Sequence, residues 1–349
     1  MPESIISHSS PEIGEDEIDA LVACVRSLQI KGGKRLKDLE DHIKNDLSYA
    51  GAVGTTTGSH AIHLALRASF PKKGANIGLP SYLCRSVFDA VVLAGHRPFL
   101  FDINPNYFSI SLEDLIKSSL DAVIVPHMFG IRAPIENLQS AGIPIIEDCA
   151  QRLAPINIAL TESKAFIKIL SFEATKLVTC GEGGMLLSDD LEVIKQSKRL
   201  RDAPYDLVEP ALHLPLTDIQ AVLALVQWKR LSHFLEMRHK LALYYLGTIG
   251  KEYPEKIPPA MRAKDTFHFR FLLWVDDPDF LIKKGAEQGI NFRRPIAPLP
   301  LHKLFNCEGS FPSTEIAFSN LLSIPIYPNL TLTEAERVTD CVCKLLGES

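Results

Sequence analysis

The chain is 349 residues long, with 46% apolar and 23% charged residues, which is typical of a globular protein with a sizeable core. Such a length predicts about two domains. The 37 basic and 42 acidic side chains give a net charge of −5, which argues against a nucleic-acid-binding surface. No apolar run approaches the ~20 residues that a membrane helix needs, and the N-terminus lacks the basic and apolar stretches of a signal peptide.

The seven cysteines are scattered along the chain and form no Cys-x-x-Cys pair. An odd number without paired spacing is typical of reduced thiols rather than of a disulfide framework or a zinc site. We therefore expect a soluble cytoplasmic protein, without a metal and without nucleic-acid or membrane partners.

Two helices are expected first, at 15–28 and 36–43. From about residue 76 to 190, short apolar runs then alternate with amphipathic stretches. Runs rich in Val, Ile, Leu and Phe are expected to be buried strands at 76–79, 98–103, 122–129, 144–149, 166–172 and 185–188. Helices are expected between them at 86–93, 112–119 and 134–141. This alternation predicts an α/β domain with a mostly parallel central sheet flanked by helices.

The segment 217–247 is one long apolar-periodic stretch, which predicts a helix with a bend. Around 253–259 the composition shifts to Pro and Lys, and we interpret this shift as a domain junction. One strand at 268–275 and helices at 279–288 and 332–346 are expected after it. The sequence thus predicts a large domain over 1–250, with the N-terminal helices included, and a smaller C-terminal α+β domain over 251–349.

The segment Gly54-Thr-Thr-Thr-Gly-Ser-His60 precedes a helical run at 61–68. Small residues at a strand-to-helix turn let backbone N–H groups converge on an anion, although an ordinary Ser or Thr helix cap has the same composition. The segment is neither a Walker A loop nor Gly-x-Gly-x-x-Gly, which disfavours a plain NAD-dependent dehydrogenase.

An apolar strand ends in Glu147 and Asp148, at the sheet edge where open α/β folds place their ligands. An acidic side chain there can bind a metal, a ribose hydroxyl or a protonated ring nitrogen; the alternative is a carboxylate on a surface loop. His127 follows another predicted strand and is a candidate to line a pocket. His60 and His63 have a spacing that can hold a metal, but without a third ligand they read as core or surface histidines.

Lys176 follows a predicted buried strand by a few residues and is trailed by Gly181-Glu-Gly-Gly184. A semi-buried lysine in such a position is suited to forming a Schiff base, because burial lowers its pKa and frees the amine to attack a carbonyl. The alternative is a surface lysine.

Together and in this order, these segments resemble the sugar aminotransferases of the DegT/DnrJ/EryC1/StrS family, which are pyridoxal-phosphate (PLP) enzymes of the aspartate aminotransferase fold. The resemblance covers nearly the whole chain, and its most specific part is Asp148-Cys-Ala-Gln151 paired with Ser171-Phe-x-x-x-Lys176. It implies that the large domain binds PLP and that the protein is a homodimer with active sites between its subunits. It also implies transfer of an amino group, with L-glutamate as donor and a nucleotide-linked keto-sugar as acceptor.

The resemblance also assigns roles around the cofactor ring. Lys176 matches the lysine that bonds covalently to PLP and shuttles a proton. Asp148 matches the carboxylate that pairs with the pyridine nitrogen, Gln151 faces the ring hydroxyl, and Ala150 packs flat against the ring. Cys84 falls where many relatives place an aromatic ring over the cofactor, and Tyr82, two residues away, is a candidate to compensate.

Ser171, Gly58, Ser59 and the backbone N–H of His60 match the family's phosphate cup. The partner subunit usually adds a segment with an asparagine and an arginine, which reads here Ala211-Leu-His-Leu-Pro215. The arginine is missing, and His213 is expected to reach the phosphate in its place.

These departures leave alternatives open. A sugar dehydratase or a cyclitol aminotransferase of the same family would keep PLP, although Lys176 argues against the dehydratases that carry histidine at this position. A non-catalytic regulatory relative would keep the fold and serve a partner.

Overall fold

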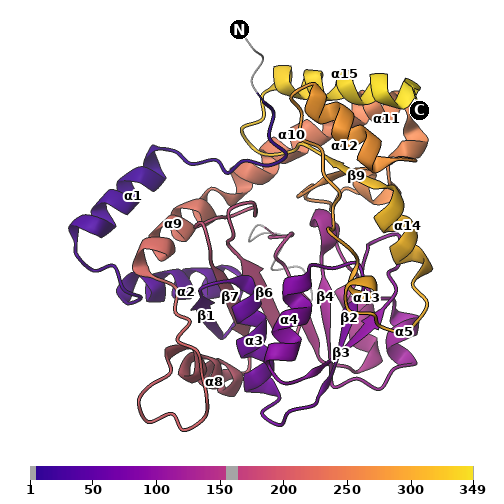
Figure 1. Cartoon of the computed structure of the whole chain (residues 1–349). Helices are drawn as coiled ribbons and strands as arrows, with labels where there is room; N and C mark the ends of the chain where they lie inside the picture. The colour runs from indigo at the N-terminus through magenta and orange to yellow at the C-terminus, as the bar shows by residue number, and fades with distance from the viewer. Residues whose placement is uncertain (1–4, 155–163, 349) are drawn as a thin grey trace.

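The computed structural model describes residues 5–154 and 164–348. A seven-stranded sheet in the order β1-β7-β6-β5-β4-β2-β3 forms the centre of the larger part of the molecule (Figure 1). Its strands are β1 (Gly51–Thr55), β2 (Asn76–Pro80), β3 (Arg97–Phe101), β4 (Ala122–Pro126), β5 (Ile145–Asp148), β6 (Ile167–Ser171) and β7 (Gly184–Ser188). Strands β3, β2, β4, β5 and β6 pair in parallel, and β7 runs antiparallel between β6 and β1. The predicted α/β class is confirmed.

All six predicted strand segments of this sheet are strands, whereas β1 was not predicted. Its sequence, Gly-Ala-Val-Gly-Thr, has one large apolar side chain, yet all five residues are buried. A Cβ atom at Gly51 would lie 2.6 Å from Cγ1 of Ile194, so the strand must be small for a helix to pack on it. Because this helix packs so closely on β1, the strand is made of mostly small residues and lacks the run of large apolar side chains by which strands are predicted.

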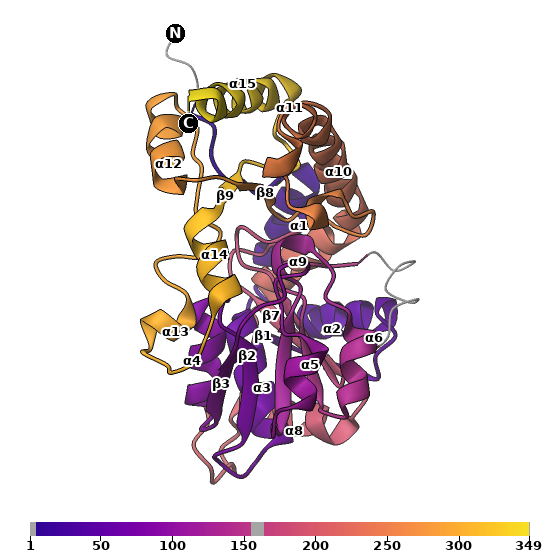
Figure 2. The same ribbon diagram turned by 90° about the vertical axis from the view of Figure 1, so that its right-hand side faces the viewer.

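Helices flank the sheet on both faces (Figure 2). They are α2 (Lys34–Asp46), α3 (Gly58–Ser69), α4 (Arg85–Leu93), α5 (Leu112–Ile116), α6 (Ile135–Leu138) and α8 (Leu191–Asp202). Helix α8 was not predicted, although Asp190 caps it by accepting hydrogen bonds from the N–H groups of Glu192 and Val193.

The predicted bend in 217–247 is confirmed. Helix α9 (Asp218–Lys229) ends and α10 (Leu231–Gly247) begins on either side of Arg230. The N-terminal helix α1 (Glu15–Arg26) packs along α9 and stands apart from the sheet (Figure 1).

A smaller layer covers the carboxyl edge of the sheet (Figures 1 and 2). It contains the antiparallel pair β8 (Phe271–Trp274) and β9 (Leu321–Ile324). Its helices are α11 (Ile249–Glu252), α12 (Pro278–Glu287), α14 (Pro312–Asn320) and α15 (Leu332–Glu348). The short helix α13 (Leu301–Leu304) lies beside the sheet, where the N–H of Leu301 donates to the carbonyl of Ser81 (2.9 Å). The predicted strand at 268–275 is thus confirmed in its centre, and β9 and α14 were not predicted.

Both chain ends enter this layer. The N–H of Ile6 donates to the carbonyl of Gly289 (2.8 Å), and the N–H of Asn291 donates to the carbonyl of Ile6 (3.0 Å). Helix α10 also packs against α11 and α15. The division at residue 250 stays a prediction, and these contacts join elements on its two sides.

Within the described ranges, no helix is long and apolar enough to cross a membrane. All seven cysteines are free thiols.

Candidate functional site

Eight of the residues expected to hold PLP line one cavity of about 240 Å³ at the carboxyl edge of the sheet. They are Gly58, Ser59, Cys84, Asp148, Ala150, Gln151, Ser171 and Lys176. These residues come from the ends of β5 and β6, the first turn of α3, the start of α4 and the loop after β6. Residues from separate parts of the sequence therefore meet where the resemblance requires. Thr57, Ser86, Glu173 and Glu182 also line this cavity, and the sequence analysis did not identify them.

Asp148 is the buried carboxylate of the cavity, with 6% of its surface exposed. One of its oxygens accepts a hydrogen bond from the N–H of Ala150 (2.9 Å). Burial raises the pKa of Asp148, and the N–H of Ala150 and the charge of Lys176 oppose this shift without cancelling it. A carboxylate in this position gains stability by facing a cation, so Asp148 fits the protonated ring nitrogen of PLP.

Gln151 is oriented by the turn after β4. Its Oε1 accepts a hydrogen bond from the N–H of Phe129 (2.7 Å), and its Nε2 lies 3.9 Å from the sulfur of Met128. Because sulfur is a weak acceptor, the amide nitrogen keeps its capacity to donate to an oxygen in the cavity. This geometry fits a ring hydroxyl.

Lys176 lies in the turn after β6 and is partly buried, as the sequence predicted. Its Nζ lies 5.3 Å from the centre of the Phe269 ring, a favourable cation–π position. Phe269 was missed as a neighbour of the site because it lies 93 residues further along the chain, two residues before β8 begins.

At the turn into α3, the backbone of Gly58 lies very close to Gly184 and to the side chain of Ser171. A Cβ atom on Gly184 would lie 2.4 Å from the backbone nitrogen of Gly58, and one on Gly58 would lie 3.0 Å from Cβ of Ser171. The backbone N–H groups at the start of α3 thus lie beside the Ser171 side chain, an arrangement that fits a phosphate.

His60 differs from its expected role in this turn. Its N–H donates to Oγ1 of the helix-capping Thr57 (3.1 Å), and its ring is hydrogen-bonded to Oγ1 of Thr56 (2.6 Å). The side chain lines a neighbouring pocket together with His63. A role of the His60 N–H in the phosphate cup would require this cap bond to open.

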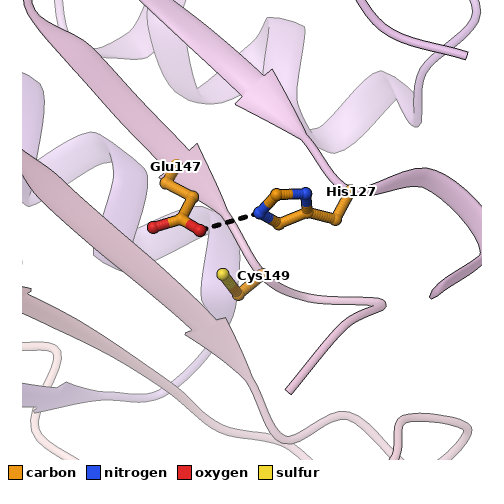
Figure 3. A group of neighbouring side chains, drawn as sticks. All are labelled: His127, Glu147 and Cys149. Atoms are coloured by element: carbon orange, nitrogen blue, oxygen red, sulfur yellow. Dashed lines mark hydrogen bonds and ion pairs between the residues drawn. The ribbon is translucent and has the colours of Figure 1, made fainter. Parts of the chain in front are cut away.

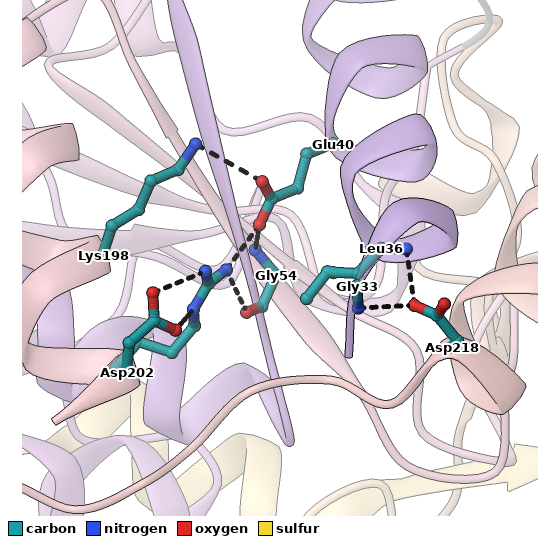
Figure 4. A network of polar contacts seen from close by, with 8 residues as sticks. Gly33, Leu36, Glu40, Gly54, Lys198, Asp202 and Asp218 are labelled. Atoms are coloured by element: carbon teal, nitrogen blue, oxygen red, sulfur yellow. Dashed lines mark hydrogen bonds and ion pairs between the residues drawn. The ribbon is translucent and has the colours of Figure 1, made fainter. Parts of the chain in front are cut away.

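The strand that leads into the turn is held by a charged network (Figure 4). The carboxylate of Glu40 accepts a hydrogen bond from the N–H of Gly54 (2.8 Å) and pairs with Arg201 (2.6 Å) and Lys198 (3.4 Å). Asp218 accepts from the N–H groups at the start of α2, at 2.8 Å for Gly33. These bonds fix β1, and through it the position of the turn.

Cys84 lines the cavity from the first residue before α4, and Tyr82 does not replace the expected aromatic ring. Tyr82 is fully buried, and its hydroxyl donates to the carbonyl of Ala317 (3.4 Å). It packs edge-on against Phe129 beneath the cavity wall. The suggestion that Tyr82 compensates for Cys84 is therefore wrong.

His213 does not line the Lys176 cavity. It lies on a separate cavity of about 520 Å³ whose lining includes Lys31, Lys198 and Arg201. The adjoining Leu214 accepts a hydrogen bond from the N–H of Thr56 (3.1 Å), next to the phosphate turn. The predicted contact of His213 with the cofactor phosphate in a partner subunit's site stays a prediction.

His127, Glu147 and Cys149 form a buried group behind the cavity, with ligand atoms within 4.8 Å of one another (Figure 3). Nδ1 of His127 accepts from the N–H of Ala133 (2.9 Å), so its Nε2–H donates to Glu147 (2.7 Å). The second oxygen of Glu147 pairs with Nζ of Lys168 at 3.0 Å. Because both ring nitrogens of His127 and both oxygens of Glu147 already have partners, we assign no metal to this group. His127 thus does not line the pocket for which it was a candidate.

The side chains of Glu147, Lys168 and His127 each have one preferred protonation state. Burial alone would raise the pKa of Glu147, but Lys168 and His127 outweigh it and hold that pKa well below its usual range. Burial also lowers the pKa of His127. The cluster is therefore a neutral imidazole with one carboxylate and one ammonium group.

Comparisons with known proteins agree with this geometry. The model of the DegT/DnrJ/EryC1/StrS aminotransferase family matches residues 11–343. The fold is similar to that of the aminotransferase TlmJ from Streptoalloteichus hindustanus, with a TM-score of 0.88 and 21% identity over 99% of this chain and 100% of that chain. It is also similar to NtdA from Bacillus subtilis with its bound cofactor PMP, with a TM-score of 0.84 and 20% identity over 99% and 87% of the two chains.

A third similar structure is the sugar aminotransferase CalS13 from Micromonospora echinospora, with a TM-score of 0.84 and 19% identity over 97% of this chain and 100% of that chain. At these identities the solved structures establish the fold, and the family model establishes the membership. The chain belongs to the DegT/DnrJ/EryC1/StrS aminotransferase family and is a PLP-dependent aminotransferase.

Proposed function

We propose that the protein transfers an amino group from L-glutamate to the carbonyl carbon of a nucleotide-linked keto-sugar. The observation that carries the proposal is one cavity that holds a partly buried lysine and a buried carboxylate, Lys176 and Asp148. Similarity to a sugar aminotransferase supports the choice of a sugar acceptor. The glutamate donor and the nucleotide-linked acceptor follow from the family resemblance.

In this proposal the cavity holds PLP by its two ends. Ser59, Ser171 and the backbone at Gly58 bind the phosphate, and Asp148 pairs with the ring nitrogen. Gln151 donates to the ring hydroxyl, while Ala150 and Cys84 border the ring. The bound cofactor supplies an electron sink that stabilises negative charge on the substrate carbon.

Lys176 is the proposed catalytic residue. Its Nζ would hold the cofactor covalently, and as a free amine it would accept the proton that leaves the substrate carbon and donate that proton again. The negative charge of Asp148 keeps the ring nitrogen protonated during this transfer. Burial excludes water from this carboxylate, so its charge acts through a medium of low polarity.

The proposed assembly is a homodimer. Apolar side chains on and after α1 are largely exposed, at 45% for Ile18, 54% for Val25 and 87% for Leu28. The loop after α8 is likewise open, with Val208 at 98%. A second copy covering these side chains would also bring His213 toward its neighbour's site. Free thiols throughout the chain support the further proposal that the enzyme acts in the cytoplasm.

Borohydride reduction followed by peptide mass spectrometry tests the central assignment. The wild-type enzyme should carry the cofactor on Lys176, and Lys176→Ala should carry none and lose about 10²- to 10⁴-fold or more in amino transfer. Lys283→Ala, at an exposed site on α12, is the matched control. A cofactor adduct on another lysine would refute the role of Lys176.

The substrates are tested in separate half-reactions. L-Glutamate should convert the bound cofactor to its pyridoxamine form with release of 2-oxoglutarate, and a nucleotide-linked keto-sugar should reverse the absorption change. A cofactor band that does not respond to glutamate would refute the proposed donor.

A further inference from the structure

Three arginines and one histidine meet in the smaller layer, near the Phe269 ring that also contacts Lys176. Arg238 lies on α10, Arg270 directly before β8, and Arg293 pairs through its backbone with Ser323 on β9. His8 comes from the N-terminal segment, which runs into this layer (Figure 2). We call these four residues the arginine cluster.

His8 orients Arg270. Nη1 of Arg270 donates to Nδ1 of His8 at 2.5 Å, so the other ring nitrogen, Nε2, carries the hydrogen and donates to Oγ of Ser323 at 2.9 Å. Burial, together with Arg270 and Arg293, lowers the pKa of His8 to about 2. His8 is therefore a neutral acceptor that fixes the guanidinium without compensating its charge.

The cluster holds several positive charges and no paired negative charge. Among residues 5–154 and 164–348, no carboxylate forms an ion pair with Arg238, Arg270 or Arg293. Arg238 is 3% exposed and donates to the carbonyls of Ile326 (2.8 Å) and Phe269 (3.3 Å). Burial, reinforced by Arg270, lowers the pKa of Arg238 to about 9.

Arg270 is less buried than Arg238. Burial and the charge of Arg293 lower its pKa to about 10. Its Nε and Nη2 have no hydrogen-bond partner in the part of the chain that the structure describes. Arg238 is buried, Arg270 is partly buried and Arg293 is exposed. Positive charges grouped without a paired anion repel one another, and an anion bound at Arg270 would offset this repulsion.

The cluster adjoins the reactive lysine. The guanidinium carbon of Arg270 lies 4.9 Å from the centre of the Phe269 ring, and Nζ of Lys176 lies 5.3 Å from the same centre. The carboxylate of Glu173, which lines the cavity, also acts on Arg270 and opposes the lowering of its pKa. An anion bound at Arg270 and the amine of Lys176 would thus lie beside the same aromatic ring.

We propose that Arg270, oriented by His8 and assisted by Arg293, binds the carboxylate of the amino-acid donor. A planar guanidinium with two free donor groups matches a carboxylate in a two-point contact, which an ammonium group does not reproduce. In this assignment Arg270 is a specificity-determining residue and His8 is a positioning residue. The inference rests on the proposed aminotransferase function and adds the group by which the donor is recognised.

Calorimetric titration of the PLP-loaded enzyme with glutarate, a dicarboxylate that cannot donate an amino group, measures this subsite without turnover. Arg270→Ala should weaken glutarate binding about 10- to 100-fold, and Arg270→Lys should recover part of the loss. In the donor half-reaction, KM for L-glutamate should rise by a similar factor, while KM for the keto-sugar stays within about twofold. Arg97→Ala, an exposed arginine on β3, is the matched control.

His8→Ala should weaken glutarate binding about fivefold, the contribution of one neutral hydrogen bond, and His8→Gln should restore it by supplying an amide oxygen to Arg270. Rescue by glutamine separates positioning from a loss of folding.

Unchanged glutarate affinity and donor KM in Arg270→Ala would overturn the proposal. A rise confined to the acceptor KM would also overturn it, because the carboxylate would then belong to the acceptor. If the wild-type enzyme binds glutarate through Arg270 but takes no amino group from glutamate, the donor proposed above fails and the carboxylate subsite stands.

Discussion

Two polar clusters lie near the Lys176 cavity, and they differ in how their charges are paired. In the first, Glu147 receives a hydrogen bond from His127 and an ion pair from Lys168, so the protein supplies both signs of charge itself. In the second, Arg238 and Arg270 lie beside a neutral His8 without a carboxylate partner among the described residues. Each cluster is costly to bury, but the first is complete and the second is completed by something that binds. The comparison separates a charge that stabilises the fold from a charge kept for a ligand.

The largest effect is expected when the carboxylate of Glu147 is removed from the first cluster, whose charges are all paired. Glu147→Gln leaves the buried ammonium of Lys168 without a counterion and should lower the free energy of unfolding by about 3–5 kcal/mol. Urea unfolding measures the change, and Glu113→Gln on the exposed surface of α5 is the control. The double variant Glu147→Leu/Lys168→Met removes both charges and should recover most of the loss. A loss below about 1 kcal/mol in Glu147→Gln would show that the cluster is not a stabilising one.

Removing the charge of the neighbouring carboxylate, Asp148, should lower kcat and leave the free energy of unfolding unchanged. Glu147 and Asp148 are consecutive on β5, so their side chains point to opposite faces of the sheet. Asp148→Asn keeps the size of the side chain but removes the charge that faces the cavity, and kcat should fall about 100-fold with the cofactor still bound. Steady-state kinetics and cofactor absorbance are measured together. Wild-type kcat in this variant would contradict the pairing of Asp148 with the ring nitrogen.

The arginine cluster predicts a pH dependence of stability. His8 stays neutral in the folded protein down to about pH 2, whereas the unfolded chain takes up a proton below about pH 6.5. The unfolded state then binds more protons, so the free energy of unfolding falls as the pH drops from 6.5 toward 2. His8→Asn should make the slope between pH 6 and pH 5 shallower by about 1.2 kcal/mol per pH unit. The exposed His233→Asn is the control, and equal slopes in His8→Asn and the wild type would contradict a buried neutral His8.

The smallest expected effect is on stability when the cation itself is removed. Arg270→Met deletes an uncompensated charge and keeps a side chain of similar length, so the free energy of unfolding without added carboxylate should change by at most about 1 kcal/mol. Wild-type protein should gain thermal stability when glutarate is added, and the variant should gain none. A large destabilisation by Arg270→Met would show that the charge of Arg270 stabilises the fold, as that of Glu147 does, and would contradict its assignment to a ligand.

The residues of the Lys176 cavity could be predicted from the sequence because each of them belongs to a short local pattern. Asp148 follows an apolar strand, Lys176 follows another, and Gly58 opens a helix, so parallel strands bring these residues to one edge. The arginine cluster offers no such pattern, since His8, Arg238 and Arg270 are far apart in sequence and share no element. Arg270 directly before the apolar run of β8 is the one local signal, a charged residue adjoining a buried strand.

The missed elements have physical reasons as well. Strand β1 consists of small residues because α8 packs closely on it, and β9 is a four-residue strand that exists through its pairing with β8. The expectation for Tyr82 also failed because of packing that the local sequence does not show. Its sequence position is two residues from Cys84, but the turn before α4 directs it into the core.

The pairing of residue 6 with residues 289 and 291 sets an order of events during biosynthesis. His8 is synthesised 315 residues before Ser323, its hydrogen-bond partner. Strands β1 to β7 are complete by residue 188, so the sheet that carries Lys176 can form while the following chain is still being made. The contacts of His8 with Ser323 and Arg270 form only after β8 and β9 have been synthesised. The proposed donor-binding group is thus assembled later than the sheet that carries Lys176.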